Sequence, residues 1–118
     1  MAGPLFIPRN ASYYHDMSIT FSRGDGYEAE VSVAGQHLSL LAHINENGYV
    51  AFVFDKNRRK ALGDPQSVTD FDDGKQYAIH IAATYLQQFT KEKFPTVEWR
   101  PTAYLQNKLD RLEAQTAL

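Results

Sequence analysis

Residues 27–54 decide the fold, and they read YEAEVSVAGQHLSLLAHINENGYVAFVF. Apolar and polar side chains alternate over 27–33 and again over 37–44, and period-two alternation is typical of half-buried β-strands. A third run, 49–54, is apolar on both faces, which favours a strand that is central or covered on both sides. Short turns rich in Gly and Asn separate the three runs. The stretch therefore predicts three antiparallel strands joined by hairpins.

The same alternation occurs just before this stretch, over 17–22. Residues 23–26 read RGDG, and their two glycines favour a tight reversal of the chain. We therefore expect a further strand over 17–22 and, with it, a four-stranded antiparallel β-meander. The preceding residues, 1–16, contain Pro4 and Pro8, which oppose regular pairing, so an irregular N-terminal arm is expected there.

Helix signals follow the meander. Thr69 or Asp70 is suited to cap a helix, and apolar residues recur at helical spacing from Phe71 to Phe89. The basic residues of 91–93 suit the C-terminus of this helix, and Pro95 bars its continuation.

A short alternating run over 96–100 predicts another strand, and Pro101-Thr102 opens a last helix. The fold class expected is α+β: a four-stranded antiparallel β-meander followed by a packing α-helix, a short strand and a C-terminal helix. Residues 17–118 are expected to form this single domain.

Composition excludes several classes of protein. The 118 residues carry twelve Lys and Arg against fourteen Asp and Glu, a net charge of -2, so no overall positive field attracts nucleic acid or an anionic membrane. Cysteine is absent, which excludes disulfides and thiolate metal sites. No apolar stretch approaches the roughly 20 residues that span a bilayer, and the N-terminus lacks the pattern of a signal peptide. A cytoplasmic protein without a membrane partner is expected.

The chain shows no motif for a metal, a cofactor or catalysis. His37 and His43 lie six positions apart on one strand face, roughly 20 Å, which is too far to share an ion. The acidic run at 70–73 fails the register of a calcium loop and is better explained as helix capping. We therefore expect no metal site, no cofactor and no catalytic residue. A small enzyme whose site is assembled from distant residues stays as a second alternative.

Nucleic-acid binding is the first alternative, and it rests on one basic loop. Four cations could hold phosphates, and aromatic side chains on the sheet could stack unpaired bases. The loop cations are Lys56, Arg58, Arg59 and Lys60, and the aromatic candidates are Tyr27 and Tyr49. Acidic residues on the same sheet oppose a continuous basic path.

Protein binding is the preferred interpretation, because the chain has more apolar surface than one small core uses. The last helix carries a stripe of three leucines, Leu105, Leu109 and Leu112. This stripe either folds back on the sheet or contacts another protein or a second copy of the chain, as in a homodimer. We expect a small non-catalytic binding or regulatory module of the adaptor or inhibitor type. Its expected contacts are Tyr27, Tyr49 and the leucine stripe, with the loop 56–60 steering the partner.

Overall fold

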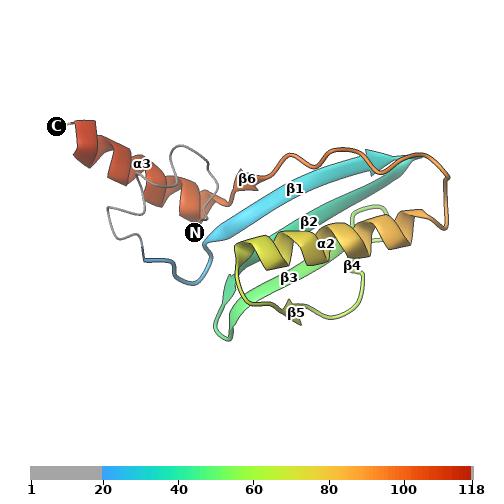
Figure 1. The fold of residues 1–118 in the computed structure, drawn as a ribbon, viewed down its shortest axis with the longest axis horizontal. Coiled ribbons are helices and arrows are strands. Elements are labelled where there is room, and N and C mark those ends of the chain that lie inside the picture. The colour runs from blue at the N-terminus through green and yellow to red at the C-terminus, as the bar shows by residue number, and fades with distance from the viewer. Residues whose placement is uncertain (1–19, 118) are drawn as a thin grey trace.

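The structure, a computed structural model, describes residues 20–117 and is built on one antiparallel sheet. Its three long strands are β1 (Gly26–Val33), β2 (Gln36–Asn45) and β3 (Gly48–Asp55), joined by hairpins (Figure 1). Their boundaries agree within a few residues with the runs of alternating sequence. With the two helices found within residues 20–117, this sheet confirms the α+β class.

Three two-residue strands complete the sheet. Both β4 (Lys60–Ala61) and β5 (Gln66–Ser67) pair with β3, and β6 (Arg100–Pro101) pairs with Tyr27 and Glu28 of β1. The strand order is therefore β4-β3-β2-β1-β6, with β5 also beside β3. In this order β3 lies inside the sheet.

Strands β1 to β4 follow one another in meander order, but they are not the four strands expected. The strand predicted over 17–22 begins outside the described residues, and residues 20–22 are not in a strand. Two interactions explain this difference. The start of the β1 edge, Tyr27 and Glu28, pairs with β6, and Phe21 packs edge-on against Phe71, with the ring centroids 5.0 Å apart. The irregular arm expected over 1–16 lies outside the described residues.

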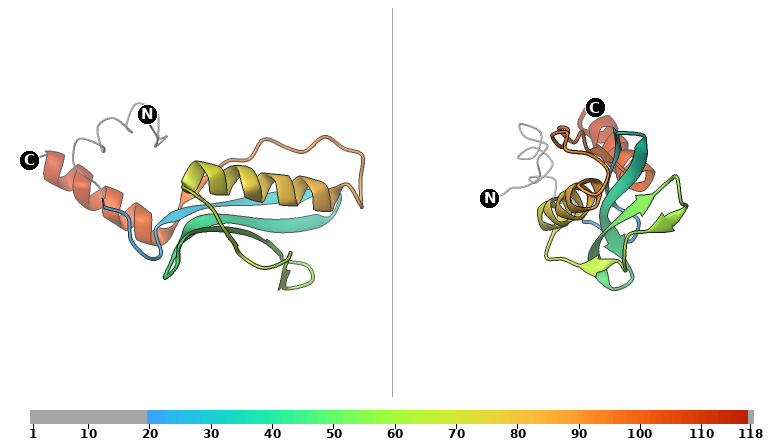
Figure 2. Two further views of the ribbon diagram at one scale, coloured as in Figure 1. Left: turned by 60° about the horizontal axis from the view of Figure 1, so that its bottom comes forward. Right: turned by 90° about the vertical axis from the view of Figure 1, so that its right-hand side faces the viewer.

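Helix α2 (Phe71–Leu86) covers one face of the sheet (Figure 2). Asp70 is its N-cap, as expected, and accepts a 2.8 Å hydrogen bond from the backbone N–H of Asp73. The helix buries a face spaced at about one turn: Phe71, Gly74, Ala78, Ala82 and Leu86. Small residues there let the helix approach the sheet closely, since a Cβ on Gly74 would lie 3.0 Å from that of Ala42.

The sheet register places the core between α2 and the strands. Ala29 of β1, Leu40 of β2 and Val53 of β3 lie side by side beneath the helix, and none of the three is exposed. The opposite sheet face is not covered by any described helix, and Leu41, Phe52 and Phe54 are half-buried there. Of the two alternatives expected for the third long strand, central or covered on both sides, the first is confirmed, because β3 pairs with β2 along one edge and with β4 and β5 along the other.

The end of α2 and the following segment differ from the prediction. The helix ends at Leu86, with Gln87 as its C-cap, and Phe89 lies beyond it. Residues 90–99 then return without regular structure alongside β1, and only Arg100 of the strand expected over 96–100 pairs with the sheet (Figure 1).

Helix α3 (Ala103–Ala117) begins after Pro101-Thr102, as expected, and extends past the end of the sheet (Figure 1). Its first half folds back, because Leu105 and Leu109 are buried against Tyr27 and Phe71. Lys108 fixes this arrangement with a 2.5 Å ion pair to the buried carboxylate of Asp25. Neither of the two described helices is long and apolar enough to cross a membrane.

Candidate protein-binding groove

The aromatic and leucine residues proposed from the sequence lie mostly in the core. Tyr27 is 7% exposed, with its ring beneath the Lys75 ammonium at 3.9 Å, and burial raises its pKa to about 12. Tyr49 is half-buried, and its ring packs edge-on against Phe71 at 5.0 Å. The Tyr27 ring is therefore covered, whereas Tyr49 keeps part of its surface exposed.

The leucine stripe is divided along α3. Leu105 and Leu109 are buried beside Tyr27, whereas Leu112 lies at the margin of the same cluster and is half-buried. Of the two outcomes expected for the stripe, Leu105 and Leu109 follow the first, because they pack on the domain itself. Only Leu112 retains surface for contact with another molecule.

Lys56, Arg58 and Arg59 lie in the turn between β3 and β4, Lys60 is the first residue of β4, and all four residues are exposed. Lys56 forms a 3.0 Å ion pair with Glu30, and Arg58 forms a 2.8 Å ion pair with the buried Asp55. Arg59 and Lys60 form no ion pair with any described residue.

The loop and the two tyrosines are far apart. Tyr49 is the second residue of β3 and the basic loop follows the end of that strand, so about 20 Å of strand separates them. Tyr27 lies at the same end of the sheet as Tyr49, because β1 and β3 run in the same direction. The structure therefore does not combine these residues into one site.

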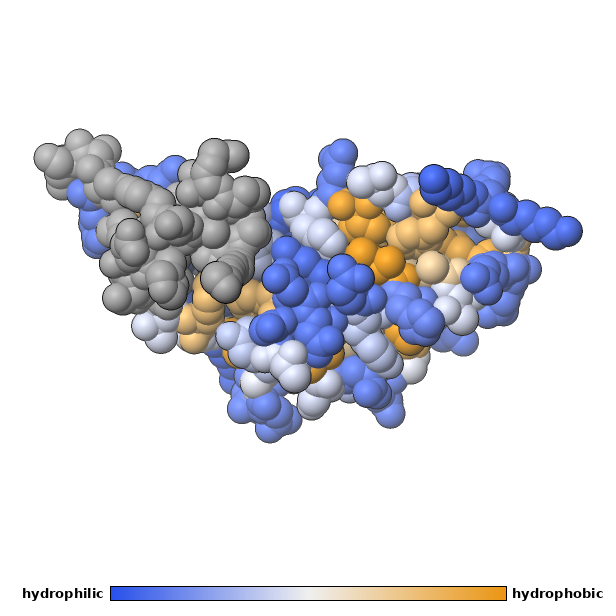
Figure 3. Space-filling model, viewed as in Figure 1, coloured by the Kyte–Doolittle hydropathy of each residue, from blue (hydrophilic) through white to orange (hydrophobic). Residues whose placement is uncertain are grey.

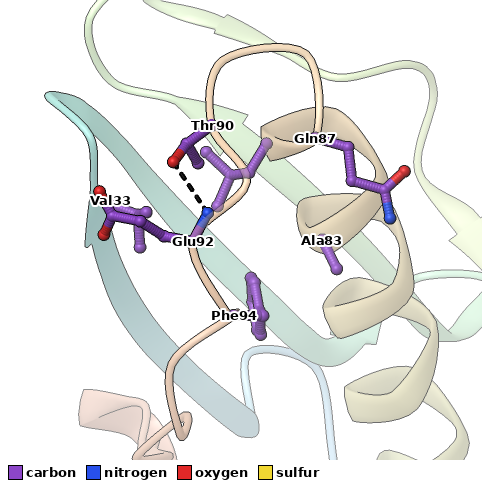
Figure 4. Close-up of a pocket in the computed structure, with 7 residues that line it drawn as sticks. Val33, Ala83, Gln87, Thr90, Glu92 and Phe94 are labelled. Atoms are coloured by element: carbon purple, nitrogen blue, oxygen red, sulfur yellow. Dashed lines mark hydrogen bonds between the residues drawn. The ribbon is translucent and has the colours of Figure 1, made fainter.

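An apolar pocket, which sequence reasoning missed, lies between the end of β1, the last turns of α2 and residues 90–94. Its volume is ≈ 90 Å³. Figure 4 shows Val33 and Ala83 on opposite sides, with Phe94 between them. The complete lining is Val33, Ala83, Leu86, Gln87, Thr90, Glu92 and Phe94.

Local sequence explains how this pocket forms. Val33 is the last residue of β1, and Ala34 and Gly35 then turn the chain with positive φ angles of 51° and 79°. The hydroxyl of Thr90 accepts a 3.0 Å hydrogen bond from the backbone N–H of Glu92, which shapes the return segment (Figure 4). Pro95 favours an extended conformation at Phe94. Phe94 in this segment forms part of the pocket wall.

The pocket adjoins a strip of apolar surface formed by α2 and the return segment 90–99. Partly buried apolar residues from both elements pack on the core along it, and hydrophobic surface gathers on this face of the molecule (Figure 3). The residues are Ile79, Phe94, Val97 and Trp99. We call this surface, together with the pocket, the α2 groove.

The only signal of the α2 groove in the sequence is weak. Phe94 is an aromatic residue directly after Lys91-Glu92-Lys93, in a stretch that otherwise indicates a helix end. The other pocket residues come from segments about 50 positions apart, and nothing in either segment alone indicates a cavity.

A second, shallower depression of ≈ 510 Å³ lies beside His43, lined also by Arg23, Asn45 and Tyr104 among others. Burial lowers the pKa of His43, and its Nδ1 atom is shielded without a hydrogen-bond partner in the described part of the chain. The ring packs edge-on against Phe52 at 5.8 Å. Within residues 20–117, no three His, Asp or Glu residues are grouped so as to hold a metal ion.

Comparisons with known proteins add no relative. No family model, no curated protein and no solved structure matches this chain.

Proposed function

We propose that this protein is a non-catalytic protein-binding module whose α2 groove receives a partner segment, with one apolar side chain inserted in the pocket. The observation that carries the proposal is the pocket itself: apolar walls from Val33, Ala83, Leu86 and Phe94, with polar Gln87, Thr90 and Glu92 also in its lining. An apolar centre with a polar rim is the usual anatomy of a protein interface.

The size of the pocket favours a side chain over a small molecule. Sites for cofactors and drug-sized ligands typically occupy about 300–1,000 Å³, whereas this pocket has ≈ 90 Å³. Burying one Leu, Ile or Met side chain contributes about 1.5–3 kcal/mol, which is the magnitude of a single anchoring residue at an interface. The mechanism is occupancy, in which the module recruits or blocks the segment that it binds.

The proposal is tested by selecting binders from a phage-displayed library of random peptides on the purified protein. We expect the selected peptides to share one large aliphatic residue. Ala83→Leu fills the pocket and is expected to weaken their binding at least about tenfold, since tenfold corresponds to ~1.4 kcal/mol. The matched control is Ala114→Leu, the same change at an exposed site on α3.

Ala114→Leu should bind within about twofold of the wild type, a difference well below 1.4 kcal/mol. Thermal unfolding of both variants checks that each is folded, and Val33→Leu provides a second way of filling the pocket. Selection of no peptides, or peptides that bind both filled variants as tightly as the wild type, would overturn the proposal.

A further inference from the structure

We infer that the segment bound by the α2 groove is acidic, with carboxylates flanking its apolar anchor residue. This inference rests on the proposed function and adds the chemistry of the partner. It is carried by the charges at the pocket end of the molecule.

The first group of charges adjoins the pocket. Lys91 and Lys93 flank Glu92, which is part of the pocket lining, and all three residues are exposed. Neither lysine forms an ion pair with a described residue. The sequence suggested that they stabilise the end of α2, but that helix ends at Leu86 and has no basic residue in its last turn. Their charges are therefore not used by the helix terminus.

The second group of charges is Arg59 and Lys60, and contacts of the neighbouring Arg58 place it at the same end of the molecule. The Arg58 guanidinium donates a 3.0 Å hydrogen bond to the hydroxyl of Tyr85 and lies 5.3 Å from the centroid of the Phe89 ring. These contacts attach the turn between β3 and β4 to the end of α2. Arg59, the next residue of that turn, and Lys60, which begins β4, consequently lie at the same end of the molecule as the pocket.

The carboxylates at this end do not cancel the cations. Asp55 and Glu30 are already paired, with Arg58 and Lys56 respectively. Four cations then remain without a described ion-pair partner: Lys91, Lys93, Arg59 and Lys60. The opposing charges are Glu92 in the pocket lining, Glu98 on the return segment and, further along the β4–β5 connection, Asp64. The pocket end is thus locally basic, although the whole chain carries a net charge of -2.

An acidic peptide with an aliphatic residue matches both the basic charges and the apolar pocket, whereas a nucleic acid matches only the charges. Carboxylates of a peptide would be attracted to the four cations, which speeds association and selects the partner. The pocket, in turn, requires an aliphatic side chain, and a nucleic acid has none. Glu92 is available in the pocket lining as an acceptor for a backbone N–H of the bound segment.

The peptides selected in the experiment above also test this inference. We expect an excess of Asp and Glu on either side of the aliphatic residue. Lys93→Glu should weaken binding about fivefold at low salt, within the range of an exposed ion pair and the repulsion that replaces it, and raising the salt concentration should weaken wild-type binding. The control is Arg111→Glu, an exposed reversal on α3, which should leave binding unchanged.

The two proposals fail in different ways. The acidic partner would be overturned, and the α2 groove left intact, by one result. In that result the peptides share an aliphatic residue and bind more weakly to Ala83→Leu, but they lack acidic residues and bind Lys93→Glu as tightly as the wild type. Peptides that ignore Ala83→Leu would overturn the groove itself. A single-stranded oligonucleotide that binds at micromolar concentration and loses affinity with Lys93→Glu would assign the basic end to nucleic acid and overturn the inference.

Discussion

The hydroxyl of Tyr85 donates a 2.6 Å hydrogen bond to the carboxylate of Asp55 and so joins α2 to the end of β3. Asp55 is completely buried, but it also accepts from the backbone N–H groups of Asn57 and Arg58 and from the Arg58 guanidinium. The bond from Tyr85, above all, lowers the pKa of Asp55 to about 2. This carboxylate therefore holds together the turn and the helix end that form the basic end of the molecule.

Removing the Tyr85 hydroxyl is expected to weaken this junction. Tyr85→Phe keeps the ring and leaves Asp55 with one fewer donor, so the free energy of unfolding should fall by about 1–3 kcal/mol. Urea unfolding measures the change. Tyr77→Phe is the matched control, because the Tyr77 hydroxyl forms no hydrogen bond with a described residue, and it should cost less than about 0.5 kcal/mol. Equal losses in the two variants would contradict a special role for Tyr85.

Asp55 should also make stability depend on pH under acid conditions. Its pKa is lowered from an ordinary value of 3.8 to about 2 on folding, so the unfolded chain takes up the proton first as the pH falls. The stabilisation is complete above about pH 4 and is lost as the pH falls through about 2. Urea midpoints measured between pH 6 and pH 2 should therefore decline more steeply for the wild type than for Asp55→Asn. Parallel curves would show that Asp55 does not contribute.

The strands and helices were predictable wherever their signals are local. Alternation and turn residues located β1, β2 and β3, and Asp70 identified the start of α2, because each signal lies within about ten residues. Residues 20–22 of the strand expected over 17–22 are not in a strand, and the local sequence does not indicate why. Arg100 and Pro101, more than 70 positions later, occupy the edge of β1.

The candidate site was much less predictable than the fold. The number of apolar residues in the chain does not indicate which side chains cover one another. Leu105 and Leu109 pack on Tyr27, so residues expected as separate contacts bury each other. The pocket instead joins Val33, the end of α2 and Phe94, which meet only when α2 is packed on the sheet. Binding surfaces assembled from such distant segments have no period or motif.

The burial of Leu109 gives a direct test of how α3 is attached. Leu109→Asp would place a charge beside Tyr27 and Phe71, and we expect it to destabilise the protein by about 3 kcal/mol or more or to detach α3. Ala114→Asp, at an exposed position of the same helix, should change stability by less than about 0.5 kcal/mol. Chemical unfolding and amide hydrogen exchange of α3 measure both effects. A helix that stood free of the sheet would respond equally to the two changes.

Substituting Gly26 and Gly35 separates two effects on stability: steric overlap with a neighbouring strand and the cost of a left-handed backbone conformation. A Cβ on Gly26 would lie 2.4 Å from both the carbonyl oxygen of Ala42 and the Cα of His43, and neither backbone atom can move without disturbing β2. Gly35, in the β1–β2 turn, has a φ of +79°, but nothing lies within 4 Å of the added atom. Gly35→Ala should therefore cost about 1 kcal/mol for the left-handed conformation alone.

Gly26→Ala should cost clearly more, about 3 kcal/mol or above, because overpacking forces the two strands apart. The separation of β1 and β2 at this point would also strain the hydrogen bond that Thr102 donates to the Gly26 carbonyl, and with it the entry into α3. Urea unfolding of the two variants measures the difference, and hydrogen exchange at Thr102 locates it. Equal costs at the two positions would mean that β1 and β2 are not in close contact at Gly26.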